Sequence, residues 1–135
     1  MAGQESKEFA LLEDLVSLAI DLREVSESLI YDFDNSLIVG IGKAIRAKAL
    51  SIQAHAQSYR APPRLKGPVP EDCTDGVTAV AGEVVELAAR LIFDFDSPAV
   101  VRAGYQVREK ALEALERIRI YKPAKKTKAR VGREL

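Results

Sequence analysis

Apolar residues recur at steps of three and four along most of the chain, the spacing that places side chains on one face of an α-helix. The first two stripes predict helices near residues 5–32 and over about 36–60. The second helix ends before Pro62, because proline disfavours helix in the residue that precedes it. Two further stripes, within 80–91 and 100–121, predict a third and a fourth helix. No alternating pattern typical of a strand competes with this interpretation.

The segments between the stripes contain turn and capping residues. Ser97-Pro98 is typical of an N-cap followed by proline at the first helical position, and Asn35-Ser36 stands at the corresponding place before the second helix. The segment from Ala61 to Asp75 holds four prolines and a glycine, so we expect a loop there that leaves the start of the third helix uncertain.

The sequence also matches itself at an offset of 62 residues. Leu-Ile-Tyr-Asp-Phe-Asp at 29–34 aligns with Leu-Ile-Phe-Asp-Phe-Asp at 91–96. Over residues 19–59 against 81–121, fourteen of 41 positions are identical without a gap. Such self-similarity at a fixed period is the signature of an internal repeat.

Together these patterns predict an all-α fold, a four-helix bundle made of two tandem, sequence-related helical hairpins. One domain spans residues 1–121, with repeat units at about 5–60 and 70–121. The last segment, 122–135, is charged and nearly free of large apolar residues, so we expect a basic, flexible tail.

Charge alternates with the predicted helices although the formal net charge is zero. Counting Lys and Arg against Asp and Glu, residues 1–36 carry −7 and residues 37–66 carry +6. Residues 67–98 then carry −6, and residues 99–135 carry +7. The first and third helices are therefore acidic, and the second and fourth are basic.

This alternation has two main interpretations. In one, helices of opposite sign are neighbours in the bundle, and weak surface pairs set their order. In the other, the basic helices and tail bind the phosphates of DNA or RNA. The predicted nucleic-acid-binding residues are Lys43, Arg46, Lys48, Arg102, Arg108, Lys110, Arg117, Lys122, Lys125, Lys126, Lys128 and Arg130. A third use is self-assembly, in which the acidic face of one molecule meets the basic face of the next.

Each repeat carries Asp-Phe-Asp where the turn of its hairpin is expected. In an up-down bundle both turns fall at the same end, so Asp32, Asp34, Asp94 and Asp96 are candidates to hold a hard cation such as Mg²⁺. The stronger interpretation is that these residues favour helix ends through capping and the helix dipole, and that no metal is bound.

Catalysis has little support in the sequence. One cysteine, Cys73, and one histidine, His55, exclude disulfide frameworks, Cys/His zinc sites and most nucleophile-histidine arrangements. All-helical magnesium-dependent nucleotide hydrolases show paired acidic motifs on neighbouring helices. Glu24-x-x-Glu27 and Glu83-x-x-Glu86 reproduce only half of that pattern. We therefore expect a protein that binds rather than catalyses, without a cofactor, and keep the hydrolase as a third possibility.

Three glycines, Gly40, Gly42 and Gly104, lie inside the two basic helices, where each costs about 1 kcal/mol relative to alanine. We expect the repeated pair, Gly42 and Gly104, to permit close approach of the second and fourth helices to each other or to a partner chain.

The sequence thus predicts association with nucleic acid or a nucleoprotein complex. The alternative is a structural or adaptor protein that forms homo-oligomers through its charged helix faces. No run of apolar residues reaches the length of a membrane span, and the first residues lack the pattern of a secretory signal, so we expect a cytoplasmic protein with no membrane partner. Few Asn, Gln, Met and Trp residues favour a thermophilic source.

Overall fold

The computed structural model describes residues 7–60 and 69–121. These residues form four α-helices and, within those ranges, no strand. The helices are α1 (Lys7–Tyr31), α2 (Ser36–Arg60), α3 (Glu71–Phe93) and α4 (Pro98–Tyr121). The sequence prediction of an all-helical, four-helix fold is therefore confirmed.

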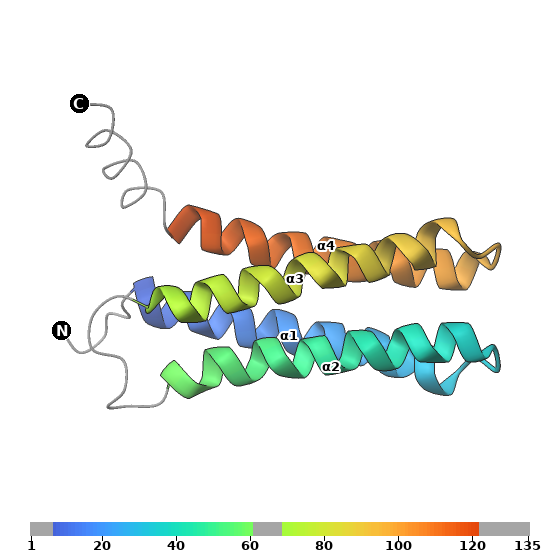
Figure 1. The fold of residues 1–135 in the computed structure, drawn as a ribbon, viewed down its shortest axis with the longest axis horizontal. Helices are drawn as coiled ribbons and strands as arrows, with labels where there is room; N and C mark the ends of the chain where they lie inside the picture. Colours follow the sequence, from blue (N-terminus) through green and yellow to red (C-terminus); the bar gives the residue numbers. More distant parts are fainter. Residues whose placement is uncertain (1–6, 61–68, 122–135) are drawn as a thin grey trace, which may run out of the picture.

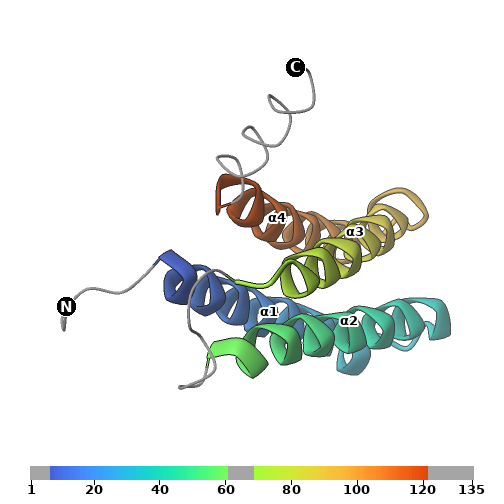
Figure 2. The same ribbon diagram turned by 60° about the vertical axis from the view of Figure 1, so that its left-hand side comes forward.

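The helices pack in the order of the chain. Each helix contacts its two neighbours, so α1 packs on α2 and α4, and α3 packs on α2 and α4. The two basic helices, α2 and α4, lie diagonally across the bundle. The turn between α1 and α2 and the turn between α3 and α4 stand apart at the same end (Figures 1 and 2).

The apolar stripes form one core that all four helices share. The positions predicted from the periodicity, such as Leu15, Ile45, Val84 and Val107, are fully buried. The aromatic rings of the two Asp-Phe-Asp turns, Phe33 and Phe95, are half-buried and pack against this core. Burial of these stripes, at about 25 cal/mol per Å² of apolar surface, is the main force that holds the helices together.

The predicted N-caps are present in both hairpins. The carboxamide oxygen Oδ1 of Asn35 accepts hydrogen bonds from the backbone N–H groups of Leu37 (2.8 Å) and Ile38 (3.2 Å). In the second hairpin, Oγ of Ser97 accepts a bond from the N–H of Val100 at 3.4 Å. These bonds satisfy backbone donors that the first turn of a helix leaves without a partner.

The structure defines the start of α3, which the sequence left uncertain. The helix begins at Glu71, so 71–75 is helical rather than loop, and Cys73 is buried in the first helical turn. Pro70 takes the N-cap position with φ −60° and ψ 145°, a conformation to which its ring is suited. The last of the four prolines therefore stands directly before the helix. The neighbouring Val69 is buried, and its N–H donates to the hydroxyl of Tyr121 at 2.9 Å, which fixes the chain where it enters α3.

The expected role of the repeated glycines was wrong. A Cβ placed at Gly42 would lie 2.9 Å from Cβ of Leu29 in α1, and one at Gly104 would lie 2.9 Å from Cβ of Leu91 in α3. Each glycine therefore permits close approach of the two helices within its own hairpin, not of α2 to α4. Gly40, by contrast, has nothing within 4 Å of such a Cβ.

Candidate functional site

Charged side chains connect the two hairpins. Nζ of Lys48 in α2 lies 2.6 Å from a carboxylate oxygen of Glu83 in α3. On the opposite side of the bundle, Nζ of Lys110 in α4 lies 3.3 Å from a carboxylate oxygen of Asp21 in α1. Adding 62 to Lys48 gives Lys110, and subtracting 62 from Glu83 gives Asp21. The two ion pairs therefore occupy equivalent positions in the two hairpin interfaces.

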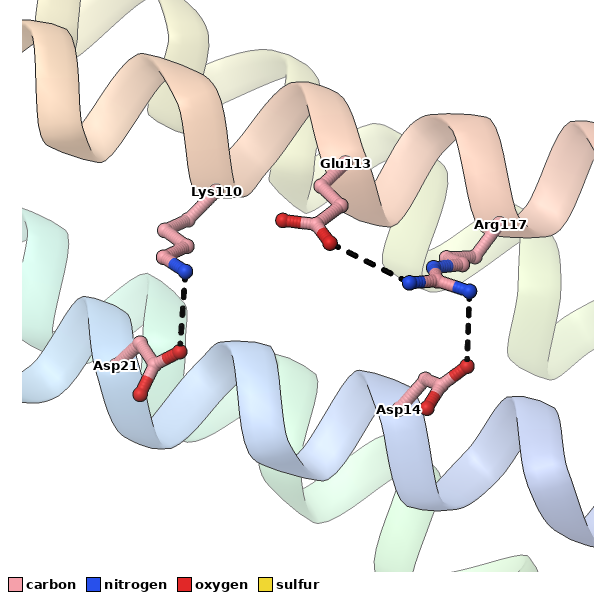
Figure 3. Close-up of polar contacts among 5 residues, drawn as sticks. All are labelled: Asp14, Asp21, Lys110, Glu113 and Arg117. Atoms are coloured by element: carbon pink, nitrogen blue, oxygen red, sulfur yellow. Dashed lines mark hydrogen bonds and ion pairs between the residues drawn. The ribbon is translucent and has the colours of Figure 1, made fainter.

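A second equivalent pair of positions lies farther from the turns. Figure 3 shows Arg117 of α4 between Asp14 of α1, at 3.4 Å, and Glu113 of its own helix, also at 3.4 Å. At the positions equivalent to Arg117 and Asp14, the ring of His55 faces Gly76. A Cβ added to Gly76 would meet Cε1 of His55 at 3.0 Å. One interface uses an ion pair where the other packs a ring on a glycine.

The predicted nucleic-acid-binding residues fall into two groups, those that form ion pairs within the molecule and those that do not. Lys48, Lys110 and Arg117 pair with acidic helices of the same molecule. All these pairs are partly exposed, so each contributes little to stability, about 0.2–1 kcal/mol. Because α2 and α4 are diagonal, acidic helices separate the two basic helices, and their charge does not form one continuous strip.

The other predicted cations on these helices take part in no such pair. Within the described ranges, no ion pair or hydrogen bond of the side chain involves Lys43, Arg46, Arg102 or Arg108. Arg46 and Arg108 are equivalent in the two hairpins. The tail residues Lys122, Lys125, Lys126, Lys128 and Arg130 lie outside the described residues.

The acidic helices carry a matching set of carboxylates. Glu24 and Glu27 on α1 and Glu86 on α3 likewise have no ion pair among residues 7–60 and 69–121. Glu24 and Glu86 are equivalent positions, and both are exposed. Carboxylates without an ion pair therefore lie on α1 and α3, and cations without an ion pair lie on α2 and α4.

Exposed apolar side chains also recur at equivalent positions. Leu50 of α2 is 45% exposed, and Leu112 of α4 is 44% exposed. Each follows the repeated arginine by four residues, which places leucine and arginine on the same helical face. Tyr31 and Phe93, the last residues of α1 and α3, are a second exposed pair. Sequence periodicity marks these positions as lying outside the core, but does not indicate a use for them.

The four aspartates of the turns do not form a metal site. In the part of the chain that the structure describes, no group of three or more His, Cys, Asp or Glu side chains is placed to hold a metal ion. Asp32 instead accepts a hydrogen bond from Oγ of Ser28 at 2.9 Å, and Asp94 lies 3.8 Å from Nε of Arg90. Each of these two aspartates thus contacts a residue of the helix that precedes it, and the two turns stand apart.

The cysteine lies in an environment that suppresses its reactivity. Sγ of Cys73 is buried and lies 3.7 Å from the backbone carbonyl oxygen of His55, to which the thiol donates. Burial raises the pKa of Cys73 from its ordinary value of 9.0 to about 11. The thiol therefore stays protonated at neutral pH, and a protonated thiol is a poor nucleophile.

A groove between α1 and α4 was not anticipated from the sequence. Its volume is about 560 Å³, and it lies toward the turn end of the bundle. Glu24, Ser28 and Asp32 line it from α1, and Arg102 and Gln106 line it from α4. Below we call it the α1/α4 groove.

Comparison with protein-family models, curated proteins and solved structures found no match. None of the helices in the described ranges combines the length and apolar content needed to cross a membrane.

Proposed function

We propose that this protein is a non-catalytic structural or adaptor protein that associates with further copies of itself through its outward helix faces. The observation that carries the proposal is the complementary set of side chains without ion pairs. Arg46 and Arg108 stand on the even helices, and Glu24 and Glu86 stand on the odd helices. In a second copy, the cations of one molecule would meet the carboxylates of the other.

The exposed leucines supply the apolar part of such a contact. Leu50 and Leu112 are each nearly half exposed and each lies beside a repeated arginine. Burial of apolar side chains provides most of the energy of association, whereas charges orient the partners and exclude wrong ones. Each molecule carries this leucine and arginine combination twice, once on each hairpin, so it can contact two neighbours.

The equivalent contacts support duplication of one ancestral hairpin. The fourteen identities at the offset of 62 include residues with matching structural roles, namely the lysines of the interhairpin ion pairs and the glycines within each hairpin. We infer that a symmetric dimer of hairpins preceded the single chain. A surface that occurs twice on one molecule is a direct consequence of that history.

Charge reversal with rescue tests the proposal. In sedimentation velocity at low salt, Arg46→Glu combined with Arg108→Glu should shift the protein to the monomeric mass of 14.8 kDa. Adding Glu24→Lys and Glu86→Lys should restore association, because both surfaces are then reversed. Reversal that leaves the mass distribution unchanged would refute the proposed contact.

Substitution of the two exposed leucines tests the apolar part of the contact, and Ile120 serves as the control. Leu50→Ser with Leu112→Ser should weaken association, whereas Ile120→Ser should not. Ile120 is more exposed, at 57%, but its equivalent in the first hairpin is already a serine, Ser58. Equal effects of the two changes would mean that general surface apolarity, not this face, drives association.

Nucleic-acid binding is the second candidate, and α2 favours it. This helix contains no acidic residue, and its Lys43 and Arg46 have no ion pair within the described part of the chain. Fluorescence anisotropy of labelled DNA and RNA should then show binding that weakens steeply with salt. If the double variant Lys43→Ala/Arg46→Ala keeps its helicity but loses that binding, nucleic-acid binding would be favoured over self-association.

A further inference from the structure

The α1/α4 groove is lined by side chains that differ in size from those at the equivalent positions of the repeat. Ala103 lines the groove on α4, and its equivalent on α2, Ile41, is a buried core residue. Val25 lines it on α1, and its equivalent on α3 is the larger Leu87; both pack against the core. At these two positions the groove therefore has smaller side chains than the equivalent positions of the repeat.

The α4 rim of the groove has no polar equivalent on α2. Arg102 and Gln106 on α4 correspond to Gly40 and Ala44 on α2, neither of which has a polar side chain. Along the same α1/α4 interface, the pairs Lys110–Asp21 and Arg117–Asp14 bridge the helices directly (Figure 3). At the groove no ion pair among the described residues joins the rims, so Arg102 faces the α1 side without a bridge.

The groove therefore has an apolar floor between two rims of opposite charge. Val25, Leu29 and Phe33 contribute to the floor. The α1 rim has the carboxylates of Glu24 and Asp32, and the α4 rim has the guanidinium of Arg102. Its volume of about 560 Å³ is within the range of small-molecule sites, roughly 300–1,000 Å³.

We propose that the α1/α4 groove binds a small zwitterion with an aromatic or aliphatic side chain, the class that includes the hydrophobic amino acids. Its ammonium group lies at Asp32, its carboxylate accepts hydrogen bonds from Arg102, and its side chain packs on the floor beside Phe33. Each charge has a complementary rim, whereas a ligand with only one charge leaves the opposite rim without a partner.

The probe is L-phenylalanine, followed by two-dimensional NMR of the amide groups of the full chain. Binding should shift the amides around Ala99 to Gln106 with a Kd on the order of millimolar, as expected for so small a ligand in an open groove. Phenethylamine lacks the carboxylate and phenylacetate lacks the ammonium group. Each should bind at least fivefold more weakly. Equal shifts by all three compounds, or no shift with phenylalanine, would overturn the proposal.

Two kinds of variant locate the site. Val25→Leu with Ala103→Ile introduces the residues of the α2/α3 interface and should abolish the shifts while leaving the protein folded. Arg102→Gln and Asp32→Asn alter exposed rim residues that lie outside the proposed self-association contact, so folding and association should be unaffected, and each should weaken phenylalanine binding at least threefold. Unchanged affinity in both rim variants would show that the charges play no part and would refute the assignment. The variants Arg46→Glu and Arg108→Glu, which test self-association, leave the groove intact and should bind phenylalanine normally.

Discussion

Lys48 forms its 2.6 Å ion pair with Glu83, a residue of the other hairpin, although the first hairpin holds the equivalent acidic residue, Asp21. Asp21 pairs instead with Lys110, the equivalent of Lys48. The lysine of each hairpin thus reaches the acidic position of the other. This exchange is the arrangement that a symmetric dimer of hairpins would have.

The first hairpin alone should therefore form a dimer. A peptide of residues 1–66 should associate into a four-helix bundle in which Lys48 of each copy pairs with Asp21 of the other. Sedimentation equilibrium should give twice the peptide mass, and circular dichroism should show helix that increases with concentration. Asp21→Lys should weaken the dimer, and Asp21→Lys with Lys48→Asp should restore it. A monomeric or unfolded peptide would contradict the inferred origin.

The buried glycines should be intolerant of even one methyl group. At Gly42 an added Cβ would lie 2.9 Å from Cβ of Leu29 and 3.1 Å from the backbone oxygen of Ser26, neither of which can move freely. Gly42→Ala and Gly104→Ala should each lower the free energy of unfolding by about 1–3 kcal/mol.

Gly40 and Gly82 are matched controls for this prediction. An added Cβ at either position meets nothing within 4 Å, so the higher helix propensity of alanine should stabilise the protein by up to about 1 kcal/mol. Urea unfolding of the four single variants measures both effects. Stabilisation by Gly42→Ala would show that the hairpin is less tightly packed than described.

The hydroxyl of Tyr121 joins the two ends of the described fold. It donates to a carboxylate oxygen of Glu8 at 3.0 Å and accepts from the N–H of Val69 at 2.9 Å. Tyr121→Phe should therefore destabilise the protein by about 1–2 kcal/mol, because the N–H of the buried Val69 loses its acceptor. Hydrogen exchange at Val69 should accelerate in the variant, and an unchanged rate would argue against this bond.

Because the pKa of Cys73 is raised in the folded protein, the free energy of unfolding should depend on pH in the alkaline range. Burial raises it from 9.0 to about 11, so between these values the unfolded chain loses a proton that the folded chain retains. The stabilisation is complete below pH 9 and is lost as the pH rises through 11.

Two measurements check this behaviour. At pH 8, a thiol reagent should modify the native protein many-fold more slowly than the urea-unfolded chain. The free energy of unfolding of the native protein should also fall between pH 9 and 11, and more steeply than that of Cys73→Ala. Rapid modification of the native protein at pH 8 would show that the thiol is accessible.

The sequence predicted the helices well because local patterns determine them. The periodic stripes and the caps at Asn35 and Ser97 specify where helices run and start. Helix order, by contrast, depends on contacts between distant residues. The pairing of Lys48 with Glu83 shows that α2 lies beside α3, but nothing local to either residue reveals it. For the same reason Gly42 could be recognised as a packing position without identifying its partner helix.

The groove shows a different limit. Its lining includes Ala103, whose equivalent position holds Ile41, and the repeat makes that contrast visible in the sequence. The groove can be recognised only when it is known which two helices form it. Once α1 and α4 are known to be neighbours, the small residues and Arg102 become a single feature.

Sedimentation velocity of the unaltered full chain over about 5–200 µM, at low and at moderate salt, tests the proposed self-association most directly. If the protein associates with itself as proposed, its sedimentation coefficient at low salt should rise with concentration above that of a 14.8 kDa monomer. At moderate salt the coefficient should fall again, because salt screens the charged contacts. A single monomeric species at every concentration and both salt levels would contradict it.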